Sequence, residues 1–262
     1  MRVYVRTKMR IFATNDDGID AEGLHTLHEV LKGFGEVIVV APDNERSAVG
    51  HSITLGMPLR FRRVKRNGEL FGYAVSGTPA DCVKLGLVEI LNGPVDLLVS
   101  GINRGSNLGI NAFYSGTVAA ALEGALFRIP SMAISADSYE DVSFKDVGKI
   151  VERILPDILK SREQIGWNFL NINIPNVKPD QVAGVRVASM NCSGFEEKFQ
   201  SHKDPKGELV YWMMGGVLPL QETEYDDTLL IRKGYVTVTP LRYDLTNYEI
   251  MEKMKRLNFS FR

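Results

Sequence analysis

The chain has 262 residues, of which 44% are hydrophobic and 24% are charged. These fractions are ordinary for a folded protein, and they exclude an intrinsically disordered chain, which combines low hydrophobicity with high net charge. The 31 Lys and Arg side chains oppose 32 Asp and Glu side chains, so the formal net charge is -1. A charge so close to zero provides no overall positive field for a nucleic-acid polymer, and we expect no such partner.

The two cysteines and the N-terminus bear on the cellular compartment. Cys82 and Cys192 lie far apart in apolar surroundings, which favours two buried free thiols over a disulfide. No apolar run approaches the ~20 residues of a membrane-spanning helix. Residues 1–8 are basic and lack the apolar stretch of a secretory signal. We therefore expect a cytoplasmic protein with no membrane partner. Because Met9 directly precedes the first predicted strand, residues 1–8 are either a short extension or the result of an upstream start codon.

Strands and helices alternate in the first part of the chain. A strand over 10–13 is followed by a helix whose apolar face repeats between 24 and 31, with Asp20 as its predicted N-cap. A second strand covers 37–41. Both strands are continuous apolar runs, which is typical of a parallel sheet buried on both faces.

A hairpin and further strand–helix units are predicted next. Asn67-Gly68 is a strong two-residue turn signal and predicts a β-hairpin over about 59–75. Thr78 and Pro79 begin a helix, with Thr78 as the cap and Asp81 favoured by the positive end of the helix. The other predicted elements are helices over about 78–90, 117–127 and 146–159, strands over 96–100, 132–135 and 169–174, and a long polar loop over 101–115.

This alternation predicts an α/β fold with a Rossmann-like, mostly parallel sheet flanked by helices. We place this core, which carries the active site, at residues 9–178. The pattern beyond it is irregular and more polar, so residues 179–262 are predicted to form a smaller, β-rich C-terminal extension. The segments expected there are strands over 185–188, 209–214 and 235–239 and an exposed, charged excursion over 193–208.

Polar clusters follow three of the predicted strands, at residues 15–18, 43–47 and 103–107. In open parallel sheets, ligands bind beyond the carboxyl ends of the strands. Because those ends lie at one edge of the sheet, we expect the three clusters to converge there and form a site.

Asp16 and Asp17 are the most informative residues in these clusters. Two neighbouring carboxylates repel each other unless a cation or another partner stabilises them, and hard divalent ions such as Mg²⁺ take oxygen ligands. Gly18 lets the backbone approach a ligand closely. The alternative is that one aspartate caps the following helix while the other faces solvent. Ser47 and Asn103 are candidates for neutral oxygen ligands, although such residues in loops commonly bind their own backbone.

A second candidate element lies at Ser115-Gly116-Thr117, directly before a helix of small residues. The free N–H groups of a helix N-terminus, together with adjacent hydroxyls, form a typical phosphate site. The alternative is a plain Ser or Thr cap without a ligand. Gly105 and Asn107 belong to the amide-rich loop that precedes this helix.

Six motifs occur in order along the chain: Thr14-Asn-Asp-Asp-Gly-Ile19, Ala41-Pro-Asp43 with Glu45-Arg-Ser-Ala48, Gly50-His-Ser-Ile-Thr54, Ser76-Gly-Thr-Pro-Ala-Asp-Cys-Val83, Ser100-Gly-Ile-Asn-Arg-Gly105 and Tyr114-Ser-Gly-Thr-Val118. Together they resemble the survival protein SurE family, densely over residues 9–190 and more loosely to the C-terminus. A set of six ordered motifs makes this resemblance specific.

The resemblance implies a metal-dependent phosphatase that acts on nucleoside 5′-monophosphates, with 3′-nucleotides or short polyphosphate as further substrates. It implies one divalent cation, Mg²⁺ or Mn²⁺, on Asp16, Asp17, Ser47 and Asn103. It also implies a homodimer or homotetramer in which the C-terminal part exchanges elements between subunits. Asp16 and Asp17 are the predicted catalytic residues, and Asp16 is the first candidate for the base that deprotonates water. The predicted phosphate- and substrate-binding residues are Asn15, Gly105, Asn107, Ser115, Gly116 and Thr117.

Two other functions stay open at this point. A phosphatase that forms an aspartyl-phosphate commonly has a second aspartate two residues after its nucleophile, where this chain has Gly18 or Ile19, so the pattern disfavours that mechanism. A nucleotide-binding regulatory protein without turnover would use the same metal- and phosphate-binding residues.

Overall fold

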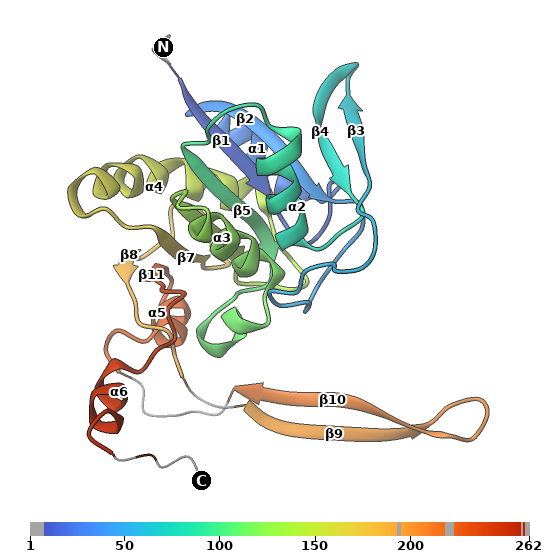
Figure 1. Cartoon of the computed structure of the whole chain (residues 1–262), viewed down its shortest axis with the longest axis vertical. Coiled ribbons are helices and arrows are strands. Elements are labelled where there is room, and N and C mark those ends of the chain that lie inside the picture. The colour runs from blue at the N-terminus through green and yellow to red at the C-terminus, as the bar shows by residue number, and fades with distance from the viewer. Residues whose placement is uncertain (1–7, 193–194, 218–222, 258, 260–262) are drawn as a thin grey trace.

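The computed structural model describes residues 8–192, 195–217, 223–257 and 259 (Figure 1). The open question of the chain start concerns residues 1–8, of which 1–7 lie outside the described residues. A nine-stranded sheet forms the centre, in the order β3-β4-β2-β1-β5-β6-β7-β11-β8. Its strands are β1 (Met9–Thr14), β2 (Gly35–Pro42), β3 (Phe61–Arg66), β4 (Glu69–Val75), β5 (Leu97–Arg104), β6 (Ser131–Ala136), β7 (Phe169–Ile174), β8 (Gly184–Val187) and β11 (Tyr235–Pro240).

Helices cover both faces of this sheet (Figure 1). They are α1 (Glu22–Leu31), α2 (Pro79–Leu85), α3 (Gly116–Leu126), α4 (Phe144–Ile165) and α5 (Asp227–Arg232). A further helix, α6 (Tyr248–Met254), lies away from the sheet on the C-terminal segment and has no buried residue (Figure 1). Helices α1 and α4 pack with one face of the central strands in one apolar cluster. Helices α2 and α3 contribute to a second cluster on the opposite face. The predicted α/β fold is therefore confirmed.

The central strands are parallel and buried on both faces. Strands β4, β2, β1, β5, β6 and β7 pair in parallel from neighbour to neighbour. Consecutive residues of β1, such as Ile11, Phe12 and Ala13, are all fully buried. Their side chains point alternately to the two apolar clusters, which explains why the sequence shows continuous apolar runs rather than alternation.

The region after residue 178 extends the central sheet and also projects from it. Strand β11 pairs antiparallel with β7, and β8 pairs parallel with β11, so both belong to the central sheet. Strands β9 (Phe195–Lys203) and β10 (Leu209–Val217) form a separate antiparallel hairpin that extends away from the body (Figure 1). The charged excursion predicted over 193–208 is thus a strand and a turn over most of its described length. A domain boundary near residue 178 stays a prediction.

Three local expectations are wrong. Asp20 does not cap α1: the N-cap is Ala21, which makes no side-chain cap hydrogen bond, and Asp20 binds Arg66 instead. Cys192 is exposed, whereas Cys82 is buried, and both thiols are free. Strand β5 does not end at residue 100 but continues to Arg104, because it keeps pairing with β6 beyond an irregularity between Gly101 and Asn103.

Helix α4 is longer than the predicted 146–159 segment. It begins after Ser143, whose side chain accepts a hydrogen bond from Asp146 N, and it ends at Gly166 in the left-handed conformation. The predicted start of α2 is confirmed: Thr78 Oγ1 accepts from Asp81 N at 3.1 Å, and Asp81 Oδ2 accepts from Thr78 N at 2.9 Å. The helical path then continues to Ile90 as a π-helical segment, η1 (Gly86–Ile90).

Asp81 also fastens the loop between β2 and β3 to α2. Its carboxylate accepts hydrogen bonds from Thr54 N at 3.0 Å and from Thr54 Oγ1 at 2.6 Å, in addition to the bond from Thr78 N. Burial acts to raise the pKa of Asp81, but the hydrogen bonds from Thr54 and Thr78 outweigh it and leave the pKa below its ordinary value of 3.8. The folded state therefore favours the charged carboxylate.

Asp81→Ala is expected to lower the free energy of unfolding at pH 7 by about 1–3 kcal/mol, because it leaves these donors without their acceptor. The difference from the parent chain should be fully present above about pH 4 and shrink as the pH falls through the lowered pKa of the folded state. Urea unfolding at pH 7 and pH 3 measures both effects. Asp20→Ala, which removes an exposed ion pair with Arg66, is the matched control and should change little. Equal stability of the two variants at pH 7 would contradict the expectation.

Candidate active site

The carboxyl ends of β1, β2, β5 and β6 meet at one edge of the sheet, beside the N-terminus of α3. Thr14 pairs with Ser100, so the residues that follow β1 lie next to the end of β5. A cavity of about 360 Å³ opens at this edge. Five of the predicted site residues line it: Asp16, Ser47, Asn103, Asn107 and Ser115. The predicted convergence of three strand ends is confirmed.

Asp16 lies at the base of this site and is only 4% exposed. Its backbone oxygen accepts a hydrogen bond from Arg46 N at 2.7 Å, which fixes the loop after β2 to the end of β1. The hydroxyl of Thr117 donates to Asp16 Oδ1. Burial raises the pKa of Asp16, and the hydrogen bond from Thr117 offsets this only in part. Neither aspartate caps α1, which excludes the capping role considered above.

Asp17 shares this electrostatic environment. Burial and the neighbouring charge of Asp16 together raise the pKa of Asp17 to about 6, although a hydrogen bond from the backbone of Arg104 opposes the rise. Glu45 lies close enough to raise the pKa of both aspartates. Two adjacent carboxylates with raised pKa values, one buried and one half-buried, form a site of negative charge that a bound cation would stabilise.

The neutral residues complete an oxygen-rich donor set. Asn103 donates its side-chain N–H to Gly105 O at 2.7 Å, which leaves Oδ1 as the side-chain atom available to a cation. The irregularity in β5 directly before it re-aims the strand, as bulges beside active sites commonly do. Ser47 is exposed and donates to Glu45 Oε1 at 2.6 Å. Carboxylate, amide and hydroxyl oxygens suit Mg²⁺ or Mn²⁺ better than softer metals, so the residues fit the implied cation.

The start of α3 lies against Asp16. Ser115 is the N-cap and its Oγ accepts a hydrogen bond from Val118 N at 3.1 Å. A Cβ atom on Gly116 would lie 2.7 Å from Asp16 Cβ and 2.9 Å from Asp16 Oδ2, so only glycine permits this approach. Thr117 uses its hydroxyl to hold Asp16. The structure therefore places Ser115 in the cavity lining, and it places Gly116 and Thr117 behind the aspartate.

The three remaining predicted substrate-binding residues, Asn107, Gly105 and Asn15, differ in whether they line the cavity. Asn107 lines the cavity and is held by Ser135 and Asn173 through its Nδ2 and its backbone N–H. Gly105 has φ +98°, and a Cβ atom on it would lie 2.2 Å from the ring of Tyr139. Asn15 is fully buried and donates to Gly18 O at 2.9 Å, so its observed contact stabilises the turn.

A buried carboxylate anchors the loop that carries Ser47. Glu123 on α3 is bonded to His51 Nε2 at 2.7 Å and to Lys84 Nζ at 2.6 Å. Burial acts to raise the pKa of Glu123, but the hydrogen bonds to His51 and Lys84 outweigh it and lower the pKa. His51, which precedes Thr54 in one of the sequence motifs, thus serves to fasten the loop to α3.

Sequence reasoning missed six residues that line the cavity: Ala48, Arg104, Ser106, Asn111, Tyr114 and Tyr139. Five of them stand in or beside the polar loops already singled out. Tyr139 follows β6, whose carboxyl end reaches the same edge of the sheet as the other three strands. Ligands bind beyond the carboxyl ends of parallel strands, and applying this principle to β6 would have identified Tyr139.

The model of the family described as Survival protein SurE matches residues 11–197. The chain belongs to the SurE family. Among SurE relatives, "5'-nucleotidase SurE" of Syntrophobacter fumaroxidans is 43% identical over 250 residues, covering 95% of this chain and all of the relative. The protein of the same name from Chlorobium limicola is 43% identical over 251 residues, with 96% and 97% coverage.

A solved structure of a SurE protein is also similar to this chain. The crystal structure of the SurE protein from Aquifex aeolicus has a TM-score of 0.80 and 39% sequence identity, and the match covers 94% of this chain and 98% of that one. In the described part of this SurE-family chain, no helix is long and apolar enough to cross a membrane. The same residues contain no group of three or more His, Cys, Asp or Glu side chains placed to hold a metal ion. The candidate ligands Asp16, Asp17, Ser47 and Asn103 include only two carboxylates, and their other two oxygens come from neutral side chains, so they do not form a group of that type.

Proposed function

We propose that this chain is a metal-dependent 5′-nucleotidase, which hydrolyses nucleoside 5′-monophosphates to nucleoside and phosphate. The observation that carries the proposal is that buried Asp16 lines a cavity together with Asn103 and the N-cap of α3, with half-buried Asp17 next to it in the chain. Relatives that match this chain over nearly its whole length bear the name 5′-nucleotidase, which supports the same activity. Hydrolysis of 3′-nucleotides and short polyphosphate belongs to the proposal as secondary activities.

Asp16, Asp17, Ser47 and Asn103 would hold one Mg²⁺ or Mn²⁺ ion. The chemistry that this ion supplies when bound is neutralisation of the negative charge on the phosphate oxygens. Asp16 faces the cavity while Thr117 holds its Oδ1, so Asp16 is the group we assign to accept the proton of the attacking water. Burial raises the pKa of Asp16, so its ionised carboxylate is a stronger base than that of an ordinary aspartate.

The start of α3 would bind the phosphate group. The hydroxyl of Ser115 lies in the cavity, and the first N–H groups of the helix carry partial positive charge. These donors stabilise the additional negative charge that develops on the phosphate oxygens in the transition state. Asn107 lies in the same lining; one N–H of its amide donates to Ser135, and the other would be a further donor to the phosphate.

A phosphate-release assay tests this function directly. Purified protein is incubated with AMP, GMP, 3′-AMP, tripolyphosphate and p-nitrophenyl phosphate, each with Mg²⁺, with Mn²⁺ and with EDTA. We expect release from the 5′-monophosphates with either metal and loss of release in EDTA. Binding of AMP without release under every condition would favour the regulatory protein instead.

An acid quench during turnover distinguishes the two hydrolytic mechanisms. Direct attack by water leaves no phosphate on the protein, so radiolabelled substrate should leave the precipitated chain unlabelled. A labelled aspartate would support the aspartyl-phosphate mechanism, which the Gly and Ile residues after the aspartate pair disfavour.

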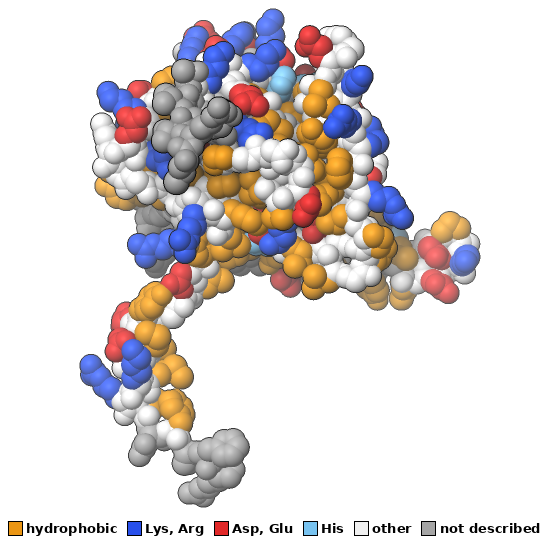
Figure 2. Space-filling model, turned by 45° about the horizontal axis from the view of Figure 1, so that its top comes forward, with side chains coloured by type: hydrophobic (Ala, Val, Ile, Leu, Met, Phe, Trp, Pro, Cys, Tyr) orange, Lys and Arg blue, Asp and Glu red, His pale blue; other side chains and the backbone are white. Residues whose placement is uncertain are grey.

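The proposal includes self-association as a homodimer or homotetramer. Large hydrophobic side chains are exposed on the β9–β10 hairpin and along the segment with α6, where Figure 2 shows them on the projecting arm. They include Phe199, Tyr211, Trp212, Leu245, Tyr248 and Met254. Light scattering at micromolar concentration should give at least twice the monomer mass, and a monomer mass would contradict this part. A cytoplasmic location stays a prediction of the sequence.

A further inference from the structure

Strand β7 carries two asparagines in the interior of the central sheet. All six of its residues are buried, and Leu170, Ile172 and Ile174 belong to the apolar cluster with α1 and α4. The alternate residues Asn171 and Asn173, which are 1% and 0% exposed, therefore face the opposite side of the sheet, towards α3. Asparagine is depleted in strands, and a buried amide costs free energy unless it is hydrogen-bonded. Two buried asparagines in a central strand thus require a specific reason.

Both asparagines bind the backbone of a single residue, Asn107, in the loop between β5 and α3. Asn173 Oδ1 accepts a hydrogen bond from Asn107 N at 2.8 Å, across 66 positions of the sequence. Asn171 Nδ2 donates to Asn107 O at 2.7 Å, across 64 positions. The amide of asparagine suits this task because it contains both a donor and an acceptor. Together the two side chains pair with the N–H and the C=O of Asn107, as a neighbouring strand would.

The side chain of Asn107 is also fixed. Its Nδ2 donates to Ser135 Oγ at 2.8 Å, and Ser135, on the neighbouring strand β6, pairs with Asn173 in the sheet. Asn107 is 7% exposed and lines the cavity that contains Asp16. Three hydrogen bonds thus hold both its backbone and its amide, and the second N–H of that amide is left for the phosphate.

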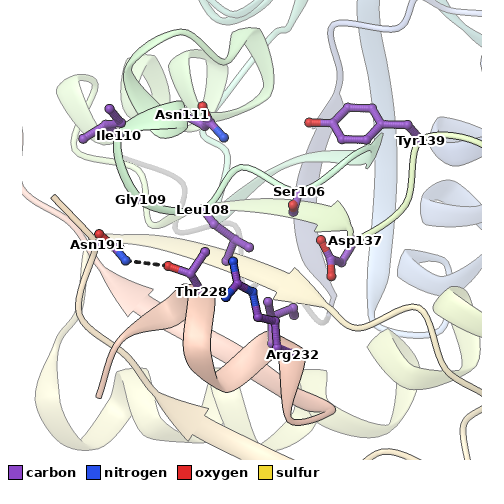
Figure 3. A pocket seen from close by; sticks show the side chains of 11 residues that line it. Ser106, Leu108, Gly109, Ile110, Asn111, Asp137, Tyr139, Asn191, Thr228 and Arg232 are labelled. Carbon is purple, nitrogen blue, oxygen red and sulfur yellow. Dashed lines mark hydrogen bonds between the residues drawn. The ribbon is translucent and has the colours of Figure 1, made fainter. Parts of the chain in front are cut away.

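A separate contact holds the loop two residues further on. Buried Asp227 on α5 accepts hydrogen bonds from Gly109 N at 2.8 Å and from Asn191 N at 3.1 Å. Figure 3 shows Gly109 near Asn191, whose Nδ2 donates to Thr228 Oγ1 at 2.8 Å. A Cβ atom on Gly109 would lie 2.4 Å from Asn191 O, so the two backbones are in close contact. Because this anchor does not involve β7, the loop should keep its path when the contacts from β7 are removed.

We propose that Asn171 and Asn173 are positioning residues of the active site, which hold Asn107 so that its second amide N–H points at the phosphate group. This inference rests on the proposed function and deepens it. Neither asparagine lines the cavity, so an effect on the bound phosphate passes through Asn107. A donor that is held in place before the substrate binds need not be ordered during the reaction, which lowers the barrier.

Replacing either asparagine by leucine, which has nearly the same size, removes its hydrogen bond to Asn107. In isothermal titration with Mg²⁺ present, Asn173→Leu and Asn171→Leu should each bind inorganic phosphate at least about fivefold more weakly, because a misplaced donor loses much of its hydrogen bond to a charged group. The kcat/KM for AMP should fall by at least the same factor. The affinity for Mg²⁺ should stay within about twofold of the parent chain, because Asn107 is not among the candidate metal ligands.

Thr239→Val is the matched control. Thr239 lies on β11 directly opposite Asn171 and is 2% exposed. Its hydroxyl makes no hydrogen bond to any residue that the structure describes. The substitution therefore makes a buried polar side chain on the same face of the sheet apolar and leaves the contacts of Asn107 in place. Its affinity for phosphate should stay within about twofold of the parent value.

A double-mutant cycle separates positioning from a general loss of structure. Asn107→Ala alone should weaken phosphate binding about tenfold or more, because it removes the amide that would contact the phosphate. In that background, Asn173→Leu should cost less than about a further twofold, since no amide is left to misplace. Circular dichroism during heating shows whether each variant is folded. Asn171→Leu provides the same cycle if Asn173→Leu does not fold.

The outcomes distinguish this inference from the proposed function. If the parent chain binds phosphate but releases none from AMP with any metal, the proposed function is wrong, and the phosphate titrations still test the positioning role. Phosphate affinity like that of the parent chain in both leucine variants would overturn the assignment of Asn171 and Asn173. Additive losses in the cycle would also overturn it, because the asparagines would then act independently of the amide of Asn107. A parent chain that binds no phosphate would contradict both proposals.

Discussion

Asp16→Asn is expected to lower the rate of phosphate release from AMP about 1,000-fold or more while leaving the chain folded. The substitution keeps the size of the side chain and an oxygen that can accept from Thr117, but it removes the negative charge that would bind the cation and the base that would accept the proton. Losing several kcal/mol of electrostatic stabilisation corresponds to a rate loss of about this size. The measurement is kcat with saturating Mn²⁺, together with thermal unfolding followed by circular dichroism.

Asp20→Asn is the matched control for this variant. Asp20 lies four residues further along, is exposed, and pairs with Arg66 rather than with the site. It should keep the activity of the parent chain. The assignment of Asp16 fails if its asparagine variant retains activity like that of the control. Because Asn at position 16 removes a buried carboxylate with a raised pKa, its thermal stability without metal should equal or exceed that of the parent chain.

Gly116→Ala is expected to lower activity about 100-fold and to weaken the apparent affinity for Mn²⁺. The added methyl group would lie 2.7 Å from Asp16 Cβ and 2.9 Å from Oδ2, so the carboxylate must move away from the position that the site requires. Misplacement of a reacting group by about 1 Å commonly costs about this factor. Titration of activity with Mn²⁺ measures both effects in the same experiment.

Gly33→Ala controls for the change from glycine to alanine. Gly33 follows α1, where an added Cβ atom would meet only the backbone oxygen of Val30 at 3.3 Å. Alanine also has a higher helix propensity than glycine, so Gly116→Ala should not lose stability through the helix itself. An active Gly116→Ala protein with an unchanged Mn²⁺ requirement would show that the contact with Asp16 does not matter for function.

The parallel core could be predicted from the sequence because each of its elements has a strong local signal. Continuous apolar runs identify β1 and β2, and Asn67-Gly68 identifies the turn of the β3–β4 hairpin. The cap at Thr78 depends on residues three positions apart, so its hydrogen bonds follow from the local sequence. The convergence of the candidate ligands also follows from the sequence, because parallel strands bring their carboxyl ends to one edge.

The features that were missed depend on contacts between distant residues. Strand β5 continues to Arg104 because β6 supplies a partner, which no local pattern shows. Asp20 faces Arg66, which is 46 positions away, instead of capping α1. Strand β9 consists of charged and polar residues apart from Phe195 and Phe199, and it becomes a strand by pairing with β10. The contacts of Asp227 with Gly109 and Asn191 belong to the same class, because they join residues 118 and 36 positions apart.

Anomalous diffraction from crystals soaked in Mn²⁺ and a phosphate analogue tests the central claim most directly, which is that the aspartate pair binds one hard cation beside an anion site. We expect one strong peak with metal-to-oxygen distances near ~2.1 Å to Asp16 and Asp17, and with Asn103 and Ser47 as its other protein neighbours. The analogue should lie between that peak and Ser115. An empty position between the aspartates at saturating Mn²⁺, together with undiminished hydrolysis of AMP by metal-free protein, would contradict the account.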